Sequence, residues 1–367
     1  MPESNWEEMT GENLLKELER YCVEQNISDI HTSPEKENVR LEVRRHGMLE
    51  EIAKISHKNY EDYVRRVKFL CKMKLNVTNV PQDAQYTFEA PERVVNVRVA
   101  SLPSRFGEKF TLRLLDPKKG ILPLKDLGFP PELYKQMQEI ANLPNGLFLV
   151  TGPTGSGKTT TLYALLSSII GKQRNIITLE DPIEYELPGI VQSQVDYSHD
   201  YTFSTGLRSA LRHDPDVILV GEIRDLETAQ TAIDASLTGH LVLSTLHTNS
   251  AIEAIPRLLS MGVSPYTFAP ALRAVLAQRL VRTLTDKCKN KDASCDPAAN
   301  ESYGGRMALP ELLMVNDNIK NMILMNESAG DILKKAKEGG YKTMDEWGKL
   351  IVEANLTSKT EVDRVTL

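Results

Sequence analysis

The chain has 367 residues, of which 41% are hydrophobic and 26% charged, and its formal net charge at pH 7 is −6. This length exceeds what one hydrophobic core usually supports, and the composition is that of an ordinary globular protein, so we expect two or three folded domains. The acidic balance disfavours nucleic acid as the main partner. The acidic start lacks the pattern of a secretory signal, and no apolar run approaches the roughly 18 residues of a membrane span, so we expect a cytoplasmic protein.

The elements up to about residue 115 predict a small α+β domain. Apolar residues at helical spacing alternate along the chain with runs of period two, the pattern of half-buried strands. The predicted elements are a helix over about 14–26, a strand over 39–44, a turn at Gly47, a helix over 60–71, and strands over 95–99 and 110–114.

The pattern changes after a charged, Pro- and Gly-rich stretch that we take as a linker over residues 116–130. Short apolar runs separated by helical segments then predict a mostly parallel sheet covered on both faces, an α/β core over about 131–285. The predicted strands are 146–151, 175–180, 217–222 and 241–246. A polar loop over 286–308 and a helical C-terminal subdomain over 309–367, with helices near 319–325, 330–337 and 344–354, complete the chain.

A phosphate-binding loop is the most specific motif. The sequence fits G-x-x-x-x-G-K-[ST] between a predicted strand and a predicted helix, which is the context that the motif requires. Backbone N–H groups and the helix N-terminus would surround phosphate oxygens, Lys158 would contact the β- and γ-phosphates, and Thr159 would offer its hydroxyl to Mg²⁺. The candidate nucleotide-binding residues are Gly152, Pro153, Thr154, Gly155, Ser156, Gly157, Lys158, Thr159 and Thr160.

Hydrolysis of ATP also requires a group that activates water. Glu222 ends an apolar strand, which in an open α/β sheet places a carboxylate in the crevice beside the phosphate loop. Glu180, Asp181 and Glu184 follow another strand, where they are candidates to orient water or Mg²⁺, although a solvated acidic turn is an alternative interpretation.

Several histidines and arginines stand near these strand ends. His240 and His247 bracket one strand and point to opposite faces, and of the two His247 lies at the carboxyl end, which favours its contact with nucleotide. Arg208, Arg212 and Arg224 are explained about equally well by solvated faces and by phosphate contact.

Two arginines of the first domain face each other if residues 94–100 and 109–115 form a symmetric hairpin. Arg98 then stands opposite Arg113. Like charges in that position repel each other. The repulsion is tolerable if both side chains are solvated, and it is also expected of an anion-binding site before its anion binds.

Four segments together resemble the secretion ATPase family that drives type II secretion and type IV pilus assembly. They are GPTGSGKTTTLYALL, ITLEDPIEYELPGIVQSQV, TGLRSALRHDPDVILVGEIRDLETAQTA and SLTGHLVLSTLHTN, and the resemblance extends from Ser28 to Thr366. It implies a hexameric ring in which a RecA-like ATPase core follows a PAS-like domain over residues 1–115. It also implies a polytopic inner-membrane platform protein and a cytoplasmic adaptor as partners, and a place at the cytoplasmic face of the inner membrane.

The resemblance also implies residue roles. Glu222 would be the catalytic glutamate, Glu180, Asp181 and Glu184 an acidic box, and His240 and His247 a histidine box. Arg98 and Arg113 would reach ATP from the PAS-like domain.

The cysteines depart from this family's pattern. Assembly ATPases of this kind often carry two C-x-x-C pairs that bind zinc, whereas here that region holds only Cys288 and Cys295. Two cysteines cannot complete a tetrahedral site, so we expect no zinc. With Cys22 and Cys71 they are too few for a disulfide scaffold, so buried or idle thiols and a reducing compartment are expected.

The leading interpretation is a motor for pilus or pseudopilus assembly, with ATP and Mg²⁺ as ligands. A retraction motor is the nearest alternative, but the Ala-Ile-Arg-Asn-Leu-Ile-Arg segment of retraction motors is absent from the sequence. A nucleic-acid translocase is a further alternative, which the acidic composition disfavours.

Overall fold

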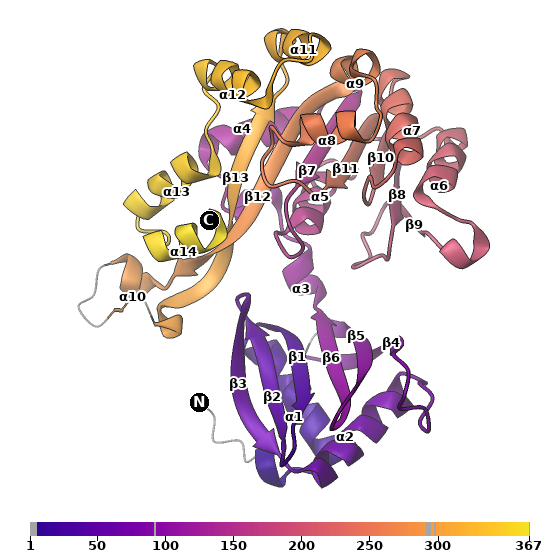
Figure 1. The fold of residues 1–367 in the computed structure, drawn as a ribbon, viewed down its shortest axis with the longest axis vertical. Helices are drawn as coiled ribbons and strands as arrows, with labels where there is room; N and C mark the ends of the chain where they lie inside the picture. The colour runs from indigo at the N-terminus through magenta and orange to yellow at the C-terminus, as the bar shows by residue number, and fades with distance from the viewer. Residues whose placement is uncertain (1–5, 92, 291–294, 297–298, 367) are drawn as a thin grey trace. The chain divides into compact units, whose positions relative to one another are not determined.

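The computed structural model describes residues 6–91, 93–290, 295–296 and 299–366. The chain divides into two compact units, Met1–Gly120 and Ile121–Leu367 (Figure 1). The division falls inside the stretch that the sequence predicted as a linker.

The first unit is a six-stranded antiparallel sheet in the order β3-β2-β1-β6-β5-β4 with helices packed on it. Ser56 caps α2 by accepting a hydrogen bond from the Asn59 N–H, which stabilises the first turn. The elements are η1 (Trp6–Glu8), α1 (Gly11–Glu24), β1 (Ile27–Pro34), β2 (Val39–Arg45), β3 (Met48–Ile55), α2 (His57–Leu70), β4 (Gln82–Ala90), β5 (Arg93–Ser104), β6 (Gly107–Leu115) and α3 (Pro117–Gly120).

The predicted elements of this unit are confirmed, and β1, β3 and β4 are additional. The turn between β2 and β3 uses Gly47 at φ 87°, a left-handed conformation that glycine adopts readily. Alternate residues of β4 and β3 are exposed, so neither edge strand has the clean apolar run that marks a strand in a sequence.

A buried ion pair lies in the core of this unit. The Lys68 Nζ donates to the Glu108 Oε2 at 2.7 Å and to the Val77 carbonyl oxygen at 2.8 Å. The two side chains are 1% and 6% exposed, so each charge depends on the other for compensation.

The second unit is built on a seven-stranded sheet in the order β13-β12-β7-β11-β10-β8-β9. All neighbouring pairs are parallel except β12 with β13. The strands are β7 (Gly146–Thr151), β8 (Ile176–Glu180), β9 (Val191–Gln194), β10 (Val217–Val220), β11 (Leu241–Leu246), β12 (Leu272–Leu284) and β13 (Tyr303–Met314). The predicted parallel α/β core is therefore confirmed.

Helices cover both faces of this sheet (Figure 1). Thr343 and Glu346 form a capping box at the start of α13, and Thr202 and Thr205 form another at α6. The helices are η2 (Leu124–Leu127), α4 (Pro131–Ala141), α5 (Lys158–Ser167), η3 (Tyr197–His199), α6 (Phe203–Ala210), η4 (Leu211–His213), α7 (Leu226–Leu237), α8 (Ala254–Ser260), α9 (Pro265–Ala271), α10 (Asp286–Lys289), η5 (Asn300–Ser302), α11 (Asp317–Leu324), α12 (Ala329–Glu338), α13 (Met344–Glu353) and α14 (Lys359–Thr366).

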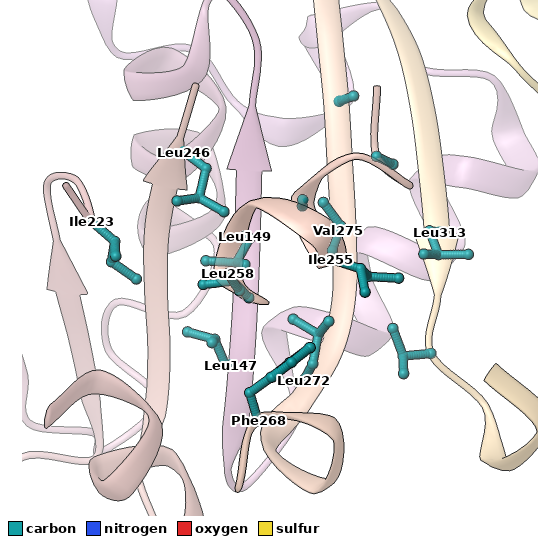
Figure 2. Packing of buried hydrophobic residues seen from close by; sticks show 14 of the residues in the cluster. Leu147, Leu149, Ile223, Leu246, Ile255, Leu258, Phe268, Leu272, Val275 and Leu313 are labelled. Carbon is teal, nitrogen blue, oxygen red and sulfur yellow. The ribbon is translucent and has the colours of Figure 1, made fainter. Parts of the chain in front are cut away.

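The core on one face of the sheet joins the central strands to the C-terminal half of the chain. Leu147 and Leu149 of β7 lie among Leu258 of α8, Phe268 of α9 and Val275 of β12, all fully buried (Figure 2). Their burial fixes the position of β7, and with it the start of the loop that follows this strand.

The predicted boundary after residue 285 is wrong in part. Residues 303–308, predicted as loop, and residues 309–314, predicted as part of a helical subdomain, form the single strand β13. Gly304, Gly305 and Pro310 made this segment resemble a loop, but β13 is an edge strand, where a missing N–H is tolerated. The three helices predicted after it are confirmed as α11, α12 and α13, within the same compact unit as the sheet.

The expectation that all four cysteines are buried or idle thiols is also wrong in part. Cys22 and Cys71 are buried and lie outside any disulfide, but Cys288 and Cys295 form a disulfide between Cα atoms 5.2 Å apart. Cys288 lies in α10, seven positions before Cys295 in the sequence.

No helix within the described residues is both long enough and apolar enough to cross a lipid bilayer. The same part of the chain contains no group of three or more His, Cys, Asp or Glu side chains arranged to hold a metal ion.

Candidate active site

The phosphate loop connects the end of β7 to the start of α5, as predicted. A Cβ atom on Gly152 would lie 2.5 Å from the Gln278 carbonyl oxygen, and Gly157 has φ 87°, so both positions require glycine. The Ser156 Oγ is buried and has no hydrogen-bond partner among the described residues. The loop thus makes a tight turn at the N-terminus of α5 and leaves the Ser156 hydroxyl available, and both features suit the binding of a phosphate group.

Lys158 lies at the first position of α5 and folds back over this loop. Its Nζ donates to the carbonyl oxygens of Gly152 at 2.8 Å and Pro153 at 3.1 Å. Burial lowers the pKa of Lys158, and the nearby Glu222 carboxylate acts in the opposite direction. The next residue, Thr159, is half-buried in the same helical turn.

Glu222 follows β10 and is held there by the neighbouring strand β11. The Thr245 hydroxyl donates to the Gly221 carbonyl oxygen at 2.7 Å, and the Ile223 N–H donates to the Thr245 carbonyl oxygen at 3.0 Å. The Glu222 side chain is 14% exposed, and its Oε2 accepts from the Arg224 Nε at 2.6 Å. The anchored peptide groups on either side fix the backbone at Glu222, and the contact with Arg224 holds its carboxylate.

His247 stands at the carboxyl end of β11 and joins the same cluster. Its Nε2 lies 3.7 Å from the Glu222 Oε2. The Thr248 N–H donates to the Thr151 Oγ1 at 2.8 Å, which ties the segment after β11 to the end of β7. Burial and the Lys158 charge lower the pKa of His247, against the effect of the Glu222 carboxylate, and this direction favours the neutral imidazole, which both accepts and donates a hydrogen bond.

The site therefore brings together Lys158, Glu222, Arg224 and His247 at the carboxyl edge of the parallel sheet. This arrangement combines a cation at the phosphate loop, a carboxylate that can take a proton, and an imidazole. Of the arginines with open roles, Arg224 thus belongs to the cluster, whereas Arg208 pairs with Glu227 and Arg212 donates to the Arg208 carbonyl oxygen at 3.0 Å.

The acidic residues after β8 are arranged differently from the prediction. Glu180 is 4% exposed, and its carboxylate accepts hydrogen bonds from the Thr178 hydroxyl, the Tyr163 hydroxyl and the Gln192 Nε2. The structure thus gives Glu180 three donors from its own chain, and its predicted contact with nucleotide stays a prediction. Asp181 is exposed and Glu184 is half-buried, and their predicted roles toward water or Mg²⁺ stay predictions.

His240 is also separated from the site. It precedes β11, and β11 runs parallel to β7, so His240 lies at the opposite edge of the sheet from the phosphate loop. Its Nδ1 donates to the Ala235 carbonyl oxygen at 2.8 Å, which fixes the imidazole at the end of α7.

Arg98 and Arg113 face each other across β5 and β6 of the first unit, as the predicted hairpin requires. Arg113 is not left with an uncompensated charge, because its Nε donates to the Asp29 Oδ1 at 2.8 Å, and Asp29 lies opposite it on β1. Arg98 is half-buried. The repulsion expected for this pair is therefore moderated by a buried carboxylate, and the contact of both arginines with ATP stays a prediction.

Sequence reasoning missed the side chains that brace the phosphate loop. Gln278 of β12 donates to the Ser156 carbonyl oxygen at 2.6 Å and accepts from the Thr161 hydroxyl at 2.8 Å. Gln278 lies 117 residues from Thr161 in the sequence, so no local spacing could have indicated the contact. The signal present in the sequence was the polar Gln278 within an otherwise apolar run.

Comparison with known proteins agrees with this geometry. Residues 7–364 match the family described as type II/IV secretion system protein. Type II secretion system protein E of Klebsiella pneumoniae is 41% identical, over 96% of this chain and 75% of that protein. The type IV pilus assembly ATPase PilB of Thermus thermophilus is 37% identical, over 97% of this chain and 43% of its own length. The crystal structure of the pilus retraction motor PilT with bound ADP superimposes with a TM-score of 0.71 and 29% identity, covering 98% of this chain and 97% of that one.

Proposed function

Because the chain belongs to the type II/IV secretion system protein family and is an ATPase with a RecA-like core, we propose that it is a motor that couples ATP hydrolysis to assembly of a pilus or secretion pseudopilus. The observation that carries the proposal is the convergence of Lys158, Glu222 and His247 at one sheet edge. Such a site can bind phosphates and activate water, which are the two requirements for hydrolysis.

The residues would act in the following way. Backbone N–H groups of the phosphate loop and the Lys158 ammonium bind the phosphates and compensate the charge that develops during transfer. The Glu222 carboxylate accepts the proton of the attacking water, while Arg224 and His247 hold its orientation. Mg²⁺, when bound, neutralises phosphate charge, and the Thr159 hydroxyl is the side-chain ligand that suits it.

We infer that Arg98 and Arg113 add positive charge to the nucleotide in the working assembly. The half-burial of Arg98 supports this role, since it reduces the side-chain freedom lost on binding an anion. The assembly that we propose is a homo-hexamer on the cytoplasmic face of the inner membrane, acting with a polytopic platform protein and a cytoplasmic adaptor, and with no nucleic-acid partner.

Assembly is favoured over retraction by the degree of similarity. The secretion and assembly proteins share 37% to 41% identity with this chain, whereas the retraction motor shares 29%. Retraction remains the second candidate because the retraction motor has the same fold over nearly the whole chain.

The proposal is tested by steady-state phosphate release from ATP and Mg²⁺. The wild-type chain should hydrolyse ATP, and Lys158→Ala should lower nucleotide affinity and turnover at least ~100-fold, because phosphate charge would lose its nearest cation. Lys172→Ala, which removes an exposed lysine after the same helix, is the matched control and should hydrolyse normally. Absence of hydrolysis by the wild-type chain, or equal rates for both variants, would refute the proposal.

A further inference from the structure

Gln278 is the one side chain in the described part of the chain that hydrogen-bonds both the phosphate loop and the helix after it through a single amide group. It lies on β12, which pairs with β7, and it is 1% exposed. Its Nε2 donates to the Ser156 carbonyl oxygen at 2.6 Å, and its Oε1 accepts from the Thr161 hydroxyl at 2.8 Å. The carbonyl oxygen can only accept, so the amide nitrogen must face Ser156 and the amide oxygen must face Thr161.

This contact selects the orientation of one peptide group. A trans peptide is planar, and its C=O and N–H point in opposite directions. Because the Ser156 carbonyl points toward Gln278, the Gly157 N–H points away from it. Gly157 has φ 87°, in a region where glycine alone moves freely, so its own backbone preference would not prevent the peptide from rotating.

The fit around Gln278 is tight on three sides. A Cβ atom on Gly157 would lie 2.9 Å from the Gln278 Nε2, and a Cβ atom on Gly152 would lie 2.5 Å from the Gln278 carbonyl oxygen. The strand therefore lies close to the loop at Gly152 and Gly157 as well as at Ser156. A loop held this way keeps its N–H groups oriented before any anion arrives.

We propose that Gln278 is a positioning residue for nucleotide binding, which fixes the phosphate loop in the conformation that presents its backbone N–H groups to phosphate. The proposal rests on the proposed ATPase function. The residue that holds the phosphate loop in its binding conformation thus comes from β12, a strand that contains no part of the phosphate-loop motif. A loop whose N–H donors are already held in place binds phosphate more tightly, because less conformational entropy is lost when the ligand binds.

The experiment measures the Kd for ADP and the steady-state kcat and KM for ATP at a temperature well below unfolding. Gln278→Ala should raise the Kd and KM about tenfold, the scale of one lost hydrogen bond to an anion-binding element, with kcat changed less than about threefold. Thr161→Val should weaken binding in the same direction, and Thr161→Ser, which keeps the hydroxyl, should bind ADP within about twofold of wild type. The Gln278→Ala and Thr161→Val effects should be non-additive, because both remove the same hydrogen bond.

Gln173→Glu changes an exposed glutamine in the turn after α5 and is the matched surface control. Wild-type affinity in a folded Gln278→Ala variant would overturn the proposal, as would equal weakening by Thr161→Val and Thr161→Ser. Loss of thermal stability with unchanged KM would also overturn it, since that pattern indicates only a structural role. A wild-type chain that hydrolyses ATP while Gln278→Ala binds normally would refute the positioning role and leave the proposed function intact.

Discussion

Replacing Glu222 with Gln keeps the size of the side chain and removes the charge that would accept a proton from water. A positioned general base contributes about 10²- to 10⁴-fold to a rate, which corresponds to about 3–5 kcal/mol of transition-state stabilisation. The Arg224 partner of Glu222 is 65% exposed, so loss of their ion pair should change folding stability by less than about 1 kcal/mol. We therefore expect a folded protein with ATP turnover at least ~100-fold slower.

Nucleotide binding provides the internal check on this variant. Glu222 raises the pKa of Lys158 against the effect of burial and adds a negative charge beside the phosphates. Removing that charge should leave ADP binding unchanged or make it tighter. The assay is single-turnover phosphate release with a parallel measurement of the Kd for ADP, and Glu139→Gln on the exposed face of α4 is the control. Near-normal turnover, or loss of ADP binding together with turnover, would contradict the role of Glu222 as the base.

Three further predictions concern the rest of the molecule. Arg98→Ala should lower ATP turnover at least ~10-fold with an unchanged melting temperature, and an unchanged rate would make Arg98 a solvated side chain. Lys68→Met should lower the free energy of unfolding by about 3–5 kcal/mol in urea titrations, because it leaves the Glu108 carboxylate buried without a partner; a loss below about 1 kcal/mol would contradict this. Burial acts to raise the pKa of Glu361, but hydrogen bonds from Arg364 and Arg282 outweigh it and lower the pKa from 4.5 to about 2, so this group stabilises the fold above about pH 4.5 and the stabilisation is lost as the pH falls toward 2. The difference in unfolding free energy between wild type and Glu361→Gln should accordingly shrink from about 3 kcal/mol at pH 5 toward zero near pH 2, and a pH-independent difference would refute the assignment.

The parts of the candidate site whose position in the fold the sequence predicted correctly are those set by local backbone geometry. The phosphate loop depends on glycines within one turn, and Glu222 depends on its place at the end of an apolar strand in a parallel sheet. The facing of Arg98 and Arg113 also followed from hairpin symmetry alone, because register is fixed once the turn is placed.

The parts that failed depend on contacts between distant segments. The hydrogen bonds that Glu180 accepts from Tyr163, Thr178 and Gln192 were not predicted, and its role toward nucleotide stays a prediction. His240 was assigned by family resemblance, although its place before β11 already indicated the opposite edge of the sheet. β13 was missed because its glycines and proline are tolerated only at the edge of a sheet, which is a property of topology.

The position of Gln278 in the sequence also has a consequence for how the protein is made. Synthesis proceeds from the N-terminus, so the ribosome delivers Thr161 117 residues before Gln278, which braces it. β12 is in turn anchored by a later segment, because Arg282 forms a buried ion pair with Glu361, 79 residues further on. A nascent chain therefore holds an unbraced phosphate loop at least until β12 has been synthesised and has paired with β7.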